Sequence, residues 1–186
     1  MLGTMEKSWL SNFFSRAQAS DRHRADSGDD PGNADAQFGV GLKFATGKGA
    51  AQDYTQAADW YRKAAAQSHA LAQFNLGTMY ASGQGVAQDE AQSVMWFGKA
   101  ARLGDAGAQF NVGKRFHRAS FTGLAKDAPE ARIEAYKWYR LAAAQGYLGS
   151  AAAGASLIFH MTRQDVAAGE QRVAAFALTT PEAVPA

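Results

Sequence analysis

The chain has 186 residues, a length that suits one domain of ordinary size. Hydrophobic residues make up 47% and charged residues 19%, which excludes a disordered or collagen-like chain. Because there is no cysteine, the chain has no disulfide framework, no thiolate zinc site and no cysteine nucleophile. A net charge of +2 is too small by itself to indicate nucleic acid or an anionic membrane as the ligand.

Residues 1–33 are predicted to form a short amphipathic helix followed by a flexible linker. The linker is the charged, turn-rich run that starts at Ser20. The helix could dock on the rest of the chain, bind a partner or lie on a membrane surface. No apolar run of about 18 residues and no signal-peptide pattern is present, so we expect a cytoplasmic protein. The apolar side of the helix carries four residues, Trp9, Leu10, Phe13 and Phe14.

An internal repeat of 36 residues organises the next part of the chain. The segment AQFGVGLKF from Ala36 lies without a gap over AQFNLGTMY from Ala72, and Trp60 moves to Trp96 in the same register. Each copy reads as helix, glycine-rich loop, helix. We expect a solenoid over residues 34–178 and a disordered tail over 179–186. Its predicted units are 36–71, 72–107, 108–149 and a C-terminal cap, 150–178.

The third copy departs from this spacing, because Trp138 follows Trp96 by 42 residues instead of 36. Six extra residues therefore lie between its two helices, and some are expected to lengthen the second helix at its start. Asp127, followed by proline and glutamate, predicts the beginning of that helix. The cap is expected to contain helices over 150–160 and 163–176, the second opened by a capping box at Thr162.

Helix-capping residues and interior glycines recur at fixed positions of the copies. Asp53, Asp89 and Ser150 are interpreted as N-cap residues. A glycine inside the first helix of each copy costs about 1 kcal/mol relative to alanine. We therefore expect the backbone of a neighbouring helix to approach closely at three positions, Gly41, Gly77 and Gly113.

These landmarks resemble the Sel-one-like repeat family, relatives of the tetratricopeptide repeats. The resemblance runs from Ala36 to about Tyr147, with the cap looking like the usual ending of bacterial members. It implies an all-α, right-handed superhelical stack of antiparallel helix pairs that acts as an adaptor in protein assemblies. The loop of the third copy departs from the family pattern.

The first helices of the copies are expected to line a concave surface that binds a peptide or a partner helix. The helical wheel leaves an outward strip on these helices that becomes basic toward the third copy. A basic strip favours an acidic partner or a C-terminal carboxylate, although a merely solvated charged face stays an alternative. The predicted binding residues are Leu42, Asn75, Thr78, Asn111, Lys114, Arg115 and Arg118.

The leading functional prediction is a protein-interaction scaffold, monomeric, with no enzymatic activity, cofactor or metal. One alternative is a cell-wall or β-lactam hydrolase, since cysteine-rich relatives of the family are associated with penicillin binding. Those relatives depend on disulfides that this chain lacks. A second alternative is nucleic-acid contact through the basic third copy, where Lys126 joins Lys114, Arg115 and Arg118.

Overall fold

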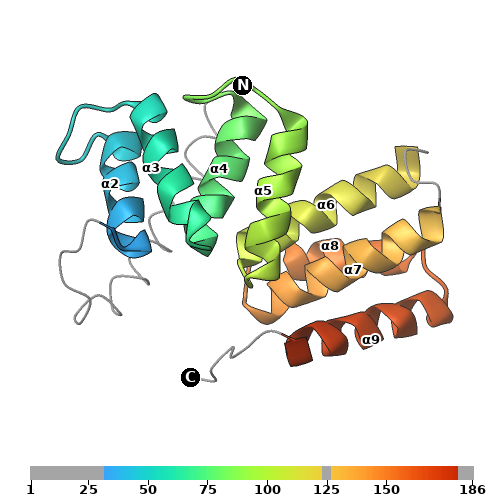
Figure 1. The fold of residues 1–186 in the computed structure, drawn as a ribbon. Coiled ribbons are helices and arrows are strands. Elements are labelled where there is room, and N and C mark those ends of the chain that lie inside the picture. The colour runs from blue at the N-terminus through green and yellow to red at the C-terminus, as the bar shows by residue number, and fades with distance from the viewer. Residues whose placement is uncertain (1–31, 123–126, 180–186) are drawn as a thin grey trace.

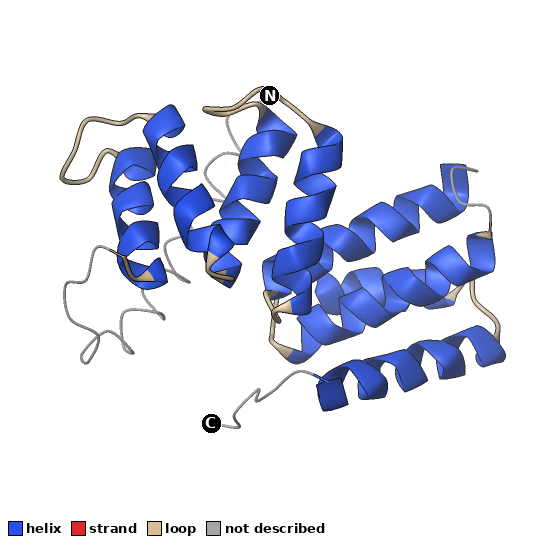
Figure 2. Cartoon of the chain, viewed as in Figure 1, coloured by secondary structure: helices blue, strands red, loops and turns tan. Residues whose placement is uncertain are grey.

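A computed structural model describes residues 32–122 and 127–179. Every regular element in these ranges is a helix (Figures 1 and 2). In chain order the helices are α2 (Ala34–Thr46), α3 (Tyr54–Ala66), α4 (Ala70–Ser82), α5 (Glu90–Arg102), α6 (Ala106–Thr122), α7 (Ala128–Ala144), α8 (Ser150–Ile158) and α9 (Arg163–Thr179).

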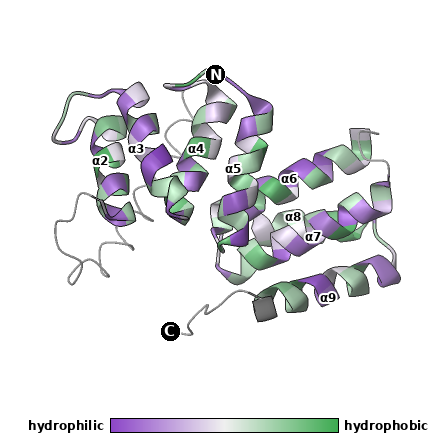
Figure 3. Ribbon diagram, in the orientation of Figure 1, coloured by the Kyte–Doolittle hydropathy of each residue, from purple (hydrophilic) through white to green (hydrophobic). Residues whose placement is uncertain are grey.

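The helices pack in the order of the chain, as the repeat predicts. α2 pairs with α3, α4 with α5 and α6 with α7, and each pair contacts the next through consecutive helices. Helices α3, α5, α7 and α9 carry both hydrophilic and hydrophobic residues along their length (Figure 3). The predicted all-α repeat solenoid is therefore confirmed in the described residues.

Polar caps fix most of the helix starts. Asp53 accepts hydrogen bonds from the N–H groups of Thr55 and Gln56, and Asp89 accepts one from the N–H of Gln92. The prediction for Ser150 is wrong. Gly149, with φ of 83°, occupies the N-cap position, and Ser150 is the first helical residue, fully buried.

The interior glycines do mark close approaches, but mainly of aromatic rings and less of backbone. A Cβ atom added at Gly41 would lie 2.7 Å from the Tyr61 ring, and one at Gly113 would lie 2.8 Å from the Tyr139 ring. The nearest backbone atom at Gly41 is the Ala57 carbonyl oxygen, at 3.3 Å. The ring of each second helix is thus seated on the glycine of its own pair, which the helical wheel alone did not reveal.

The third pair is longer than the first two. Helices α2 to α5 have 13 residues each, whereas α6 and α7 have 17. The connection shortens from seven residues (47–53 and 83–89) to five (123–127), which accounts for the six extra residues. The direction of the helices also changes between α5 and α6 (Figure 1).

The final helix, α9, packs along α7 and not on α8 (Figure 1). Arg172 on α9 lies 2.5 Å from a Glu130 oxygen and 2.7 Å from a Glu134 oxygen, both on α7. The predicted capping box at its start is confirmed, since Thr162 and Asp165 each accept a hydrogen bond from the other's N–H. Among the described helices, none combines the length and the apolar character that crossing a bilayer requires.

Candidate functional site

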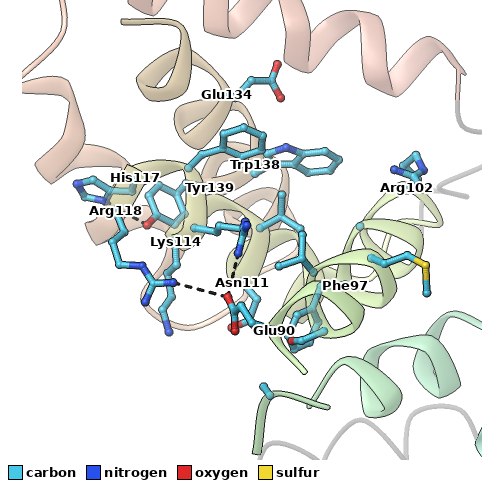
Figure 4. Close-up of a pocket in the computed structure, with 18 of the residues that line it drawn as sticks. Glu90, Phe97, Arg102, Asn111, Lys114, His117, Arg118, Glu134, Trp138 and Tyr139 are labelled. Carbon is cyan, nitrogen blue, oxygen red and sulfur yellow. Dashed lines mark hydrogen bonds and ion pairs between the residues drawn. The ribbon is translucent and has the colours of Figure 1, made fainter. Parts of the chain in front are cut away.

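A groove of about 880 Å³ opens where the second and third pairs meet, and we call it the α5–α7 groove. Helix α5 forms one wall, α7 forms the other, and α6 runs between them. In Figure 4, Trp138 lies on one side and Glu90 on the other, with Lys114 between them. Phe121, on the last turn of α6, is 53% exposed. The apolar lining includes Val94, Met95, Val112, Phe116, Phe121 and Trp138.

Two arginines share a single carboxylate at the edge of the groove. The guanidinium of Arg115 lies 2.9 Å from a Glu90 oxygen, and that of Arg118 lies 3.8 Å from the same oxygen. All three side chains are largely exposed, so the interaction is weak, typically below about 1 kcal/mol. Glu90 is therefore a carboxylate that a ligand carboxylate could replace at little cost.

The groove also carries cations that form no ion pair with any other described residue. Lys114 lies over the Phe110 ring, 5.6 Å from its centroid, and Arg102 stands near the end of α5. The second acid of the lining, Glu134, already contacts Lys137 and Arg172. The groove thus carries four cations but only one available carboxylate, that of Glu90, which makes it electropositive. The cations are Arg102, Lys114, Arg115 and Arg118.

A histidine and a tyrosine meet at the α7 side of the groove. His117 Nδ1 lies 3.1 Å from the Tyr139 hydroxyl, and the His117 ring packs against Phe121. Burial lowers the pKa of His117 below its usual value, and the nearby His160 lowers it further. Burial raises the pKa of Tyr139 to about 12. Both groups are therefore neutral near pH 7 and add polarity to the wall, but no charge.

The α5–α7 groove brings together four of the seven predicted binding residues. Asn111, Lys114, Arg115 and Arg118 all line the α5–α7 groove. Leu42 and Thr78 lie outside it and are half-buried.

The placement of Asn75 on the outward strip is wrong, because this side chain is only 6% exposed. Asn75 occupies the same repeat position as Asn111. The buried side chain of Asn75 faces Tyr61 of the first pair. Asn111 lines the α5–α7 groove and is half-buried.

Sequence reasoning missed the walls that α5 and α7 contribute. The sequence places Glu90 directly after the predicted cap Asp89. Its position opposite Arg115 depends on the angle between successive helix pairs, which the sequence does not show. In the repeat pattern, Trp138 serves only as a landmark of the third copy. Trp138 lies one helical turn after Glu134, and this polar neighbour was the signal in the sequence that its ring borders a groove.

Several predicted residues lie outside the described ranges. They are Trp9, Leu10, Phe13, Phe14 and Lys126, together with the linker and the tail. Within the described residues, no three His, Asp or Glu side chains gather at metal-binding distance.

The family assignment follows from three matches to one repeat model, described as Sel1 repeat, at residues 34–69, 70–105 and 106–147. Each match covers one of the helix pairs seen in the structure. The chain belongs to the Sel1 repeat family. The matches begin two residues before the predicted units and stop before α8, so the last two helices lie outside them.

Two solved structures support the same fold. A Sel1 repeat protein from Oxalobacter formigenes is 36% identical, with a TM-score of 0.59, over 68% of this chain and 91% of that one. A protective antigen of uropathogenic Escherichia coli strains that displays an SLR fold is 39% identical, with a TM-score of 0.55, over 63% of this chain. The present chain spans 24% of that antigen's length. The comparison with curated proteins gave no match.

Proteins built from Sel1 repeats are generally scaffolds for protein interactions, and the family is typically non-catalytic. In this Sel1 repeat chain, the α5–α7 groove lies at the junction of the second and third repeats, and residues of α4, α5, α6 and α7 line it.

Proposed function

We propose that the chain is an interaction scaffold whose α5–α7 groove binds an acidic, apolar segment of a partner protein. The observation that carries the proposal is the combination of an apolar lining with a surplus of cations. An apolar side chain of the partner enters between Val112 and Trp138, and a carboxylate of the partner replaces Glu90 on Arg115 and Arg118.

The size of the groove limits what enters it. A volume of about 880 Å³ lies in the range of small-ligand sites and is filled by a few side chains. The groove therefore accepts the anchoring residues of a helix or extended peptide, while the rest of the segment lies across α5 and α6.

Comparative capture from the source organism tests the proposal. The wild-type chain and a Lys114→Glu/Arg118→Glu variant serve as baits, and retained proteins are compared by mass spectrometry. The matched control is Lys43→Glu/Lys48→Glu, which reverses two exposed lysines far from the groove. We expect at least one partner that the control retains and the groove variant loses. Identical retention by all three baits would show that the groove is not the binding site.

A second pair of baits separates the groove from the N-terminal segment. A chain that begins at Ala34 retains the partner if the repeats alone recognise it. Loss of the partner with residues 1–33 would assign recognition to the segment that contains Trp9 and Phe13.

Neither alternative function gains support from the groove. A hydrolase needs a nucleophile beside a general base, and the groove's serine, Ser93, is almost fully buried. Arg115 and Arg118 already interact with Glu90, and a nucleic acid would meet this carboxylate as a repulsive charge. A nucleic acid also needs a row of cations along its phosphates, whereas the apolar lining of the groove suits a partner segment that carries an apolar side chain beside one carboxylate.

A further inference from the structure

The last turn of α9 lies beside one end of the α5–α7 groove. The Phe176 ring of α9 packs edge-to-face on the Trp138 ring of the groove, with the ring centroids 5.4 Å apart. Phe176 also packs against a core cluster that includes Ala100 and Ala101, in the last turn of α5. Figure 1 agrees, because α9 ends on the side of the third pair where α5 also ends. The chain therefore leaves α9 near the end of the groove that Arg102 lines.

Arg102 gives this end of the groove a positive charge. Its exposed side chain forms no ion pair with any other described residue. Figure 4 shows Arg102 on one side of Trp138 and Arg118 on the other. At that other end, Arg115 and Arg118 already interact with Glu90. The groove thus has a cation on each side of Trp138, and only the Arg102 end lacks an acidic partner in the described part of the chain.

The sequence that follows α9 has the chemistry that suits the Arg102 end. We call residues 180–186 the C-terminal tail, and they read TPEAVPA. The tail has one acidic side chain, Glu182, and no basic one, and Val184 follows two residues later. Alternate side chains of an extended chain point to the same side, so Glu182 and Val184 can face the groove together. The tail is therefore an acidic, apolar segment of the kind that the groove is proposed to bind.

The tail is long enough to lie along the groove. Helix α9 ends at Thr179, as expected from Pro181, because a proline disfavours the helical conformation of the residue before it. Seven extended residues reach about 24 Å. The 13 residues of α5 form a helix about 20 Å long. A tail that enters at Arg102 can therefore pass Trp138 without moving α9.

We propose that the C-terminal tail binds the Arg102 end of the α5–α7 groove in its own chain and competes there with a partner segment. Glu182 pairs with Arg102, and Val184 packs on the apolar lining beside Trp138. The inference rests on the proposed function, since it gives the tail the apolar contacts that the partner would otherwise make. A short tether provides a local concentration in the millimolar range, so individually weak contacts are enough.

Paramagnetic relaxation in the full chain tests this contact without any partner. The chain has no cysteine, so Ala183→Cys provides one site for a nitroxide label. In the proposed arrangement Ala183 points away from the groove, and the label disturbs neither contact. The label should broaden the Gly98 amide and Trp138 indole signals, which belong to the groove. The Trp60 indole, on α3, is the reference in the same sample and should stay sharp.

A charge swap separates binding from mere proximity to α9. Arg102→Glu should remove most of the broadening in the groove, and combining it with Glu182→Arg should restore it, because the ion pair forms again with its charges exchanged. Arg163→Glu makes the same charge change at the exposed first residue of α9 and should leave the broadening intact. Equal broadening in the wild type and in Arg102→Glu would overturn the proposal, since a freely moving tail gives that result.

Two further results would overturn it. Broadening that appears when the nitroxide and the isotope label are on different chains would assign the tail to the groove of a second copy. An absence of broadening in the groove would leave the site to the N-terminal segment or to a partner alone.

The capture experiment keeps this inference separate from the proposed function. A tail that fills the groove about half of the time lowers the apparent affinity for a partner roughly two-fold. Glu182→Gln should therefore retain about twice as much of the partner that Lys114→Glu/Arg118→Glu loses. Unchanged retention would show that the tail does not compete. If no partner depends on the groove, the proposed function fails, and the relaxation data still decide whether the tail binds.

Discussion

Interior glycines decide how closely the two helices of a pair approach. At Gly113 a Cβ atom would lie 2.8 Å from Cδ1 of Tyr139, a ring that is almost completely buried. The ring also contacts the rings of Phe110 and His117, so it cannot shift without disturbing both. The glycine therefore lowers helix propensity but allows the aromatic ring to pack directly against the helix backbone.

Gly113→Ala is expected to destabilise the protein by about 1–3 kcal/mol, because overpacking exceeds the gain of about 1 kcal/mol in helix propensity. The matched control is Gly98→Ala on α5, where the added Cβ would meet only the Arg102 side chain, at 3.7 Å. That control should be neutral or stabilising. Urea unfolding measures both changes, and equal losses in the two variants would contradict the explanation.

His69 shows how one residue links capping to pH. Its Nδ1 accepts a hydrogen bond from the Ala72 N–H, and its Nε2 lies 3.1 Å from an Asp35 oxygen. Burial lowers the pKa of His69, and Asp35 opposes this shift only in part. Asp105 caps α6 at the equivalent position, where its carboxylate accepts a hydrogen bond from the Ala108 N–H.

The pH dependence of stability follows from this lowered pKa. The cap is fully present above the unfolded-state pKa of about 6.5 and weakens as the pH falls toward the folded-state value. The melting temperature of the wild type should fall between about pH 7.5 and 5.5. His69→Asn retains a capping side chain, so its fall should be smaller. An unchanged pH dependence in this variant would exclude His69 as the source.

At the scale of elements, α9 is held to α7 by Arg172. The guanidinium contacts Glu130 and Glu134, and its hydrogen bond lowers the pKa of Glu130. This interaction is present above the ordinary glutamate pKa of about 4.3 and is lost as the pH falls below it.

Arg172→Met should accelerate amide hydrogen exchange in α9 at pH 7 while leaving α2 to α5 unchanged. The expected cost is at most about 1 kcal/mol, because Arg172 and Glu130 are both partly exposed. Arg163→Met, at the exposed first residue of α9, is the control and should leave the exchange unchanged. Faster exchange in both variants would point to general loosening of the helix.

The elements themselves could largely be predicted from sequence. The helices of the cap, expected over 150–160 and 163–176, are found at Ser150–Ile158 and Arg163–Thr179. Helical periodicity and capping residues are local signals, which explains this agreement. The length of α6 was not predicted, because no local signal showed that the extra residues divide between both helices.

The binding surface could be predicted only in part, because exposure depends on how neighbouring pairs are oriented. Asn75 and Asn111 have the same place on the helical wheel, yet one is buried and the other borders the groove. The angle between pairs is a tertiary property. The basic residues of α6 were found because their chemistry changes along the repeat, which is visible in sequence.

At the scale of the whole molecule, Glu90 is expected to compete with the partner's carboxylate. Glu90→Gln should release Arg115 and Arg118 and raise the affinity for an acidic partner segment roughly 3- to 10-fold. Asp59→Asn, on the exposed surface of α3, is the control. Calorimetric titration at two salt concentrations measures both, and weaker binding by Glu90→Gln would show that Glu90 itself contacts the partner.

The extra helical turns of the third pair also act as a stop signal for the stack. Compared with the 13-residue helices, α6 gains residues 119–122 and α7 gains residues 128–131. The first addition supplies Phe121, which contacts His160 after α8, and the second supplies Glu130, which binds Arg172 of α9. Another 36-residue unit should therefore be inserted before α6 if the stack is to be lengthened. A unit placed after α7 would separate the added turns of α6 and α7 from α8 and α9, which they contact.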